Sequence, residues 1–229
     1  MVIAIVLLLL VLLILGPQWW AKRTFRRYDE VLPHIPGNGA SLARHLLEQF
    51  AISGVQVEEG KRGSDHYDPV RRVVNLGTDN YHNASLTAIA VAAHEVGHAI
   101  QHHRNEAMLA LRTKLVRLAA ATQQLGAAAM FLLPVVMIVT RVPAAGLVMA
   151  VIGLGSMASA TLVHLVTLPV ELDASFGKAL PILKKGQYIE GTDEKAVRRI
   201  LRAAALTYVA GSLASLLNLA RWLAFLRRA

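Results

Sequence analysis

Four long apolar stretches constrain the fold of this chain more than any other feature of its sequence. They cover residues 1–16, 125–140, 144–170 and 203–226. About 20 apolar residues are needed for a helix to cross a bilayer, and an exposed backbone inside lipid must form helices or a closed barrel. With 55% hydrophobic residues, the chain is too apolar for an ordinary soluble domain. The pattern predicts a mainly α-helical integral membrane protein.

The first apolar stretch has the features of an uncleaved anchor. It is followed by Trp19 and Trp20, which are residues typical of a membrane interface, and then by Lys22, Arg23 and further basic residues. A secretory signal would carry its positive charges before the apolar stretch and not after it. We therefore expect residues 1–20 to form a transmembrane anchor whose N-terminus lies outside the cell.

The later apolar stretches predict a hairpin and a last span. Residues 125–170 form the expected transmembrane hairpin, which turns at Arg141-Val142-Pro143, and residues 203–229 form a C-terminal hydrophobic helix. Of the 24 lysines and arginines, 20 lie in residues 21–124 and 171–202. The positive-inside rule places such segments in the cytoplasm, so we expect a multi-pass protein of the cell membrane.

Charge and cysteine content narrow the classes of partner and ligand. The net charge is +9, but the basic residues flank apolar runs and are not interleaved with aromatic residues. This pattern excludes a nucleic-acid-binding protein and favours the lipid bilayer as the partner. The chain has no cysteine, so any protein ligand to a metal must be histidine, aspartate or glutamate.

The sequence His94-Glu95-Val96-Gly97-His98 has metal-binding spacing. It lies in a run, residues 84–103, that predicts one helix, and residues four apart lie on the same face of a helix. His94 and His98 can then bind one metal ion, with Glu95 beside it to accept a proton from water. The alternative is a buried helix without metal, but buried histidine and glutamate need partners. Gly97, which is unfavourable inside a helix, indicates close packing there.

The segment before this helix predicts a small α+β unit. Residues 39–53 predict a helix that ends near Gly54, residues 55–58 and 71–76 predict strands, and residues 65–69 form a turn-like cluster. We expect residues 21–124 to be a small cytoplasmic, zincin-like part with a β-hairpin or sheet, whose edge strand can pair with an extended peptide. Residues 104–124 predict a helix outside the bilayer or at its surface.

A third metal ligand must come from another segment. Glu171 is the preferred candidate because it ends an apolar helix that can pack beside the first one. Asp173 is the alternative, either as the ligand itself or as a carboxylate that orients His94 or His98. His102 is excluded because eight helical residues separate it from His94, a rise of about 12 Å.

Three segments together resemble a known family. Residues 65–69, 92–101 and 168–175 are similar to those of the bacterial membrane zinc metallopeptidases of the YugP type. The resemblance implies a gluzincin-like site with one zinc ion per chain, His94 and His98 as ligands and Glu95 as the general base. Related membrane peptidases have an aspartate four residues after the ligand glutamate, where this chain has Ser175.

The resulting functional hypothesis is a zinc-dependent endopeptidase at the cytoplasmic membrane face. Its substrate would be a peptide or a membrane protein, and His66 or Tyr67 would stabilise the oxyanion. The first alternative is a non-catalytic metal-binding membrane scaffold or adaptor. The second is a zinc transporter that uses His164, an ionisable residue within an apolar run, although a hydrogen bond to a neighbouring helix is the preferred explanation of this residue.

Overall fold

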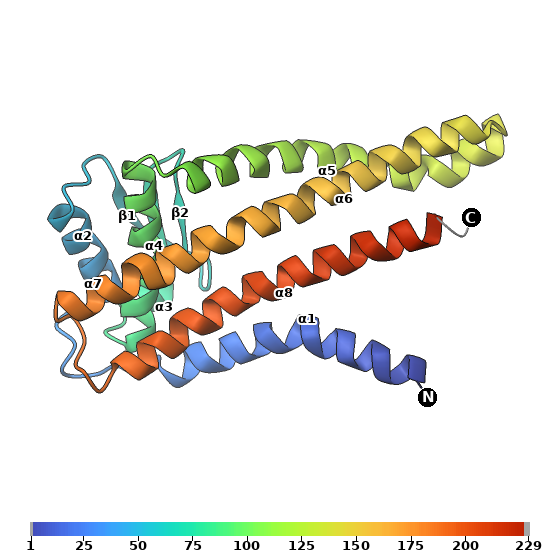
Figure 1. Cartoon of the computed structure of the whole chain (residues 1–229). Coiled ribbons are helices and arrows are strands. Elements are labelled where there is room, and N and C mark those ends of the chain that lie inside the picture. The colour runs from blue at the N-terminus through green and yellow to red at the C-terminus, as the bar shows by residue number, and fades with distance from the viewer. Residues whose placement is uncertain (1, 227–229) are drawn as a thin grey trace.

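A computed structural model describes residues 2–226, which form a bundle of long helices attached to a smaller head (Figure 1). The long helices are α1 (Val2–Arg27), α5 (Ala107–Thr140), α6 (Pro143–Leu172) and α8 (Glu194–Leu226). The head contains α2 (Gly39–Gln49), α3 (Thr78–His82), α4 (Leu86–His103), α7 (Leu180–Lys185) and a three-stranded sheet. The expected mainly helical architecture with a small sheet is confirmed.

Among the residues that the structure describes, three helical segments are long and apolar enough to cross a membrane. They are Ala107–Leu133, Leu147–Lys185 and Glu194–Leu217. The expected anchor is helical as part of α1, but the surroundings of the side chains of residues 1–11 lie outside what the structure describes. The hairpin turns where expected, because α5 ends at Thr140 and α6 begins at Pro143.

The α5 helix is longer than the sequence pattern suggested. Residues 107–140 form one uninterrupted helix, whereas a surface helix followed by a separate span was expected. Its contact with α6 is close: a Cβ atom added to Gly126 would lie 2.3 Å from Ser156 Cβ, and the hydroxyl oxygens of Thr122 and Ser159 are 3.0 Å apart. Small residues therefore let the two backbones approach each other along the hairpin.

The sheet has the order β1-β3-β2. Strands β1 (Gln56–Gly60) and β3 (Val73–Gly77) are parallel, and β2 (His66–Asp68) pairs with β3 in antiparallel fashion. The prediction of a turn at residues 65–69 was wrong for these three residues, which form an edge strand. The turn begins at Asp68, whose carboxylate accepts hydrogen bonds from the backbone N–H groups of Val70 and Arg71 at 2.8 and 3.1 Å.

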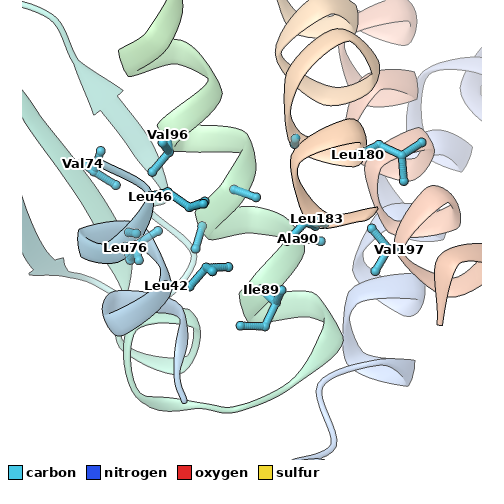
Figure 2. Close-up of a cluster of buried hydrophobic side chains, with 14 of the residues drawn as sticks. Leu42, Leu46, Val74, Leu76, Ile89, Ala90, Val96, Leu180, Leu183 and Val197 are labelled. Atoms are coloured by element: carbon cyan, nitrogen blue, oxygen red, sulfur yellow. The ribbon is translucent and has the colours of Figure 1, made fainter. Parts of the chain in front are cut away.

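The α4 helix is packed on both sides in the core of the head. Figure 2 shows side chains from α2, β3, α4, α7 and α8 in one cluster, including Leu46, Leu76, Val96, Leu183 and Val197. Capping fixes the helix starts: Asn38 accepts from the Ser41 N–H in α2, and Ser85 accepts from the Ala88 N–H in α4. The α2 helix ends at Gln49, earlier than expected, and Gly54 lies in the turn that follows with φ +76°.

A π-helical segment brings the end of α6 against α4. Residues Asp173–Ala179 (η1) continue α6 into α7 without a break. A Cβ atom added to Gly97 would lie 2.9 Å from the carbonyl oxygen of Ala174. Gly97 thus permits a backbone contact between α4 and η1, as its presence in the helix had indicated, and this contact sets the position of Glu171 relative to His94 and His98.

Candidate metal centre

Two imidazoles and one carboxylate meet between α4 and the end of α6. The ligand atoms of His94, His98 and Glu171 all lie within 4.8 Å of one another. Oε2 of Glu171 is 3.2 Å from His94 Nε2 and 3.4 Å from His98 Nε2. All three side chains are buried, and Glu171 is only 1% exposed. Two nitrogen ligands and one carboxylate oxygen are a set that catalytic zinc sites use, so these residues fit a zinc ion.

The second nitrogen of each histidine has its own partner. Nδ1 of His94 lies 3.1 Å from Ser175 Oγ, and Nδ1 of His98 lies 2.9 Å from Gln101 Oε1. If each Nδ1 carries the proton and donates it to these oxygens, the lone pair on each Nε2 points toward Glu171 and remains free for a metal. Ser175, four residues after Glu171, is therefore the side chain that lies beside His94 Nδ1.

Gln101 and Asp173 form a relay behind His98. The Gln101 amide nitrogen donates to the Val170 carbonyl at 3.0 Å and to Asp173 Oδ2 at 2.7 Å, which leaves its oxygen for His98. Asp173 also pairs with Lys178, and Lys178 pairs with Glu106. The structure does not bring Asp173 into the ligand cluster; its carboxylate touches His98 only through Gln101. Sequence reasoning missed Gln101, although a buried glutamine three residues after His98 was a usable signal.

Glu95 is buried beside the cluster on α4. Burial raises the pKa of its carboxyl to about 7, and the negative charge of Glu171 acts in the same direction. His94 and a hydrogen bond from the Tyr67 backbone N–H lower that pKa. A carboxylate whose pKa lies near neutrality is suited to accept and return a proton, and the edge strand β2 contacts this carboxylate directly through its backbone.

The two expected oxyanion donors are engaged elsewhere. His66 is exposed, and its Nδ1 lies 3.0 Å from the Ser64 carbonyl. The Tyr67 hydroxyl lies 2.7 Å from His102 Nδ1, so His102 is paired with Tyr67 and stays outside the ligand cluster. His164 packs against α8, with its ring 3.4 Å from the position of a Cβ added to Gly211.

Arg112 is a functional candidate that the sequence pattern did not single out. Its Nη2 lies 3.2 Å from Oε1 of Glu171, the carboxylate oxygen that faces away from the two histidines. Within residues 2–226 that oxygen accepts no well-directed hydrogen bond, so Arg112 is its counter-charge. Arg112 belongs to α5, which gives no periodic or motif signal linking it to α4 or α6.

Comparisons with known proteins agree with this geometry. Residues 3–227 match the family described as "Putative neutral zinc metallopeptidase". The chain is also 38% identical over 216 residues to "Putative membrane protease YugP" of Bacillus subtilis (strain 168), an alignment that covers 91% of each chain. No solved structure matches the chain significantly.

Proposed function

The chain belongs to the "Putative neutral zinc metallopeptidase" family, and on that premise we propose that it is a zinc-dependent endopeptidase of the cell membrane. The observation that carries the proposal is the buried convergence of His94, His98 and Glu171, with Glu95 next to them. In this proposal the head is a zincin-like unit, one zinc ion binds per chain, and the reaction takes place at the cytoplasmic face.

The proposed reaction is hydrolysis of a peptide bond by a water molecule. A bound zinc ion would polarise the scissile carbonyl and lower the pKa of water. Glu95 accepts a proton from the attacking water as the carbon–oxygen bond forms, and it donates this proton to the leaving amine as the carbon–nitrogen bond breaks. The pKa of about 7 that burial gives Glu95 suits both transfers.

Arg112 is the better placed cation for charge that develops during the reaction. The Tyr67 hydroxyl could reach such charge only after leaving His102. The Arg112 guanidinium already faces the cluster beside Glu171. Preorganised donors of this kind lower the energy of an oxyanion without reorganising during the reaction. We therefore assign the stabilising role to Arg112 in place of His66 or Tyr67.

The sheet suggests how a substrate would lie. Strand β2 is at the edge of the sheet and pairs only with β3 among the described strands. Its Tyr67 backbone N–H faces Glu95, so the open side of β2 borders the site. An extended peptide that paired with this side, taking the Tyr67 N–H in place of Glu95, would pass across Glu95 and the metal ligands, which is the mode of β-strand addition.

Replacement of Glu95 by glutamine tests the proposal. Glu95→Gln keeps the size of the side chain but cannot act as a base, so cleavage should fall by about 10²- to 10⁴-fold while the purified protein still holds one zinc ion. Glu48→Gln, at an exposed position of α2, is the matched control and should retain full activity. Undiminished proteolysis by Glu95→Gln would refute the base role. Stoichiometric zinc without any cleavage by the unmodified chain would favour the non-catalytic scaffold instead.

A further inference from the structure

A groove leads away from the metal centre between the β2–β3 turn and α5. Its inner end is a cavity of about 290 Å³ lined by Tyr67, His98 and Arg112 among others. Its outer end is a cavity of about 330 Å³ that reaches Asn105. Both cavities have Pro69, Val70 and Leu109 in their walls, so they are two parts of one groove. The groove therefore begins at a metal ligand and runs outward.

Part of the groove wall is apolar. Val70 stands at the β2–β3 turn and is an apolar side chain with 70% of its surface exposed. Opposite it, Leu109 is buried and Val116 is exposed on α5. Pockets of about 300 Å³ lie at the small end of ligand sites, which is the size needed for one or two side chains of a polypeptide.

The charge of the groove is positive. Arg112 at the inner end pairs with Glu171, and at the outer end Lys178 is shared between Glu106, at 2.9 Å, and Asp173. Arg117 borders both cavities and Lys114 borders the outer one. Neither of these two cations forms an ion pair with any residue between 2 and 226. An occupant with a negative charge would supply the missing partner.

The groove lies beside the first turns of α5, at the start of a candidate membrane span. The candidate span on α5 starts at Ala107, so Leu109, Lys114 and Arg117 occupy its first turns, next to the head (Figure 1). A polypeptide in this groove would thus lie close to the boundary between water and lipid. In another membrane protein, the segment directly outside a transmembrane helix can reach such a position.

We propose, as an extension of the peptidase function above, that this groove binds the substrate residues on one side of the scissile bond. It selects an apolar side chain, held between Val70 and α5, followed by an acidic residue that pairs with Arg117 and Lys114. A lipid headgroup could satisfy the same cations, but the inner end of the groove opens at His98, where only a chain continuous with the scissile bond gains from binding. The favoured substrate is the acidic juxtamembrane segment of a membrane protein.

Matched peptides test the inference with the full-length, zinc-loaded chain in lipid nanodiscs. The three peptides share one cleavage site and carry beside it Leu then Asp, Leu then Lys, or Ser then Asp. Arg117→Glu should lower the ratio of kcat/KM for the Leu-Asp peptide over the Leu-Lys peptide by roughly tenfold, because it turns an attraction into a repulsion. Val70→Ser should lower the preference for Leu-Asp over Ser-Asp by roughly fivefold. Arg199→Glu, at an exposed position of α8, is the control and should change neither ratio.

Binding gives a second measurement that does not depend on turnover. In the Glu95→Gln background, fluorescence anisotropy of the labelled Leu-Asp peptide should show Arg117→Glu weakening its binding by a similar factor. Cleavage with unchanged preferences in both groove variants would overturn the groove inference and leave the peptidase function standing. If the unmodified chain cleaves none of the peptides and binds none, both fail. If Arg117→Glu alters only the affinity for phosphatidylglycerol vesicles, the groove binds lipid and the inference is wrong.

Discussion

Gln101→Leu isolates the relay behind His98 and is the sharpest test of the metal centre. The substitution keeps a side chain of roughly similar size at this buried position but removes three hydrogen bonds: from His98 at 2.9 Å, to Val170 at 3.0 Å and to Asp173 at 2.7 Å. The Val170 carbonyl still accepts from the Asp173 backbone N–H, and the Asp173 carboxylate still pairs with Lys178. Of the three groups that Gln101 contacts, His98 is therefore the one that loses its hydrogen-bond partner.

The expected change in zinc affinity follows from the His98 Nδ1–H group, which is left without an acceptor. A buried donor that loses its acceptor costs about 1–3 kcal/mol, and the only other way for His98 to respond is to rotate or change its tautomer, which removes Nε2 from the site. Either way the cost appears in zinc binding, where it corresponds to a roughly 5- to 150-fold higher Kd. In other metal sites, loss of the group that hydrogen-bonds a histidine ligand weakens metal binding by about 10- to 100-fold. The range expected for Gln101→Leu agrees with this value.

The assay is a competition titration of the purified chain against a zinc indicator, with the melting temperature of the metal-free protein measured in parallel. Gln56→Leu, at an exposed position of β1, is the matched control and should leave the zinc Kd unchanged. Asp173→Asn should raise the Kd less than Gln101→Leu does, because Gln101 keeps its bond to His98. A Gln101→Leu protein that is folded and binds zinc within twofold of the unmodified chain would refute the relay.

Three further outcomes follow from the structure. Gly97→Ala should destabilise the protein by about 1–3 kcal/mol, seen as a lower melting temperature, because the added Cβ would lie 2.9 Å from the Ala174 carbonyl; Gly155→Ala, where nothing lies within 4 Å, should not. Glu171→Gln should raise the zinc Kd at least about a hundredfold, since it removes the anionic ligand itself; near-normal binding in the indicator titration would show that another group is the ligand. Since the chain has no cysteine, Ser53→Cys adds a single thiol on the head, and a membrane-impermeant maleimide should label it only after the cell membrane is opened; labelling of intact cells would place the head outside.

The residues that repeat along a helix were the ones that sequence reasoning could place. The four-residue spacing of His94 and His98 determines that they share a face once the helix forms, and α4 forms as expected. Glu171 was found because it is an acid at the end of an apolar helix, where few acids occur. Local periodicity was enough for the two histidines, whereas the choice of Glu171 also assumed that its helix packs beside the helix of His94 and His98.

The residues that depend on packing between distant elements were missed. Arg112 reaches Glu171 only because α5 and α6 lie alongside each other, and nothing in the sequence near Arg112 distinguishes it from other basic residues. The strand β2 is three residues long, too short for alternation to be recognised, and its pairing with β3 provides the stabilisation that its own sequence lacks. The π-helical geometry of η1 likewise carries no residue pattern that separates it from an α-helix.

The division of the ligand set between α4 and α6 has a consequence for biosynthesis. The two histidines precede the hairpin in the chain, and the carboxylate lies at the far end of its second leg. In the proposed function, a nascent chain that has exposed α4 but has not yet formed both legs of the hairpin would hold an incomplete metal site, and so would any fragment cut before residue 143. The proposed hydrolytic activity would thus arise only once the second leg of the hairpin is in place beside α4.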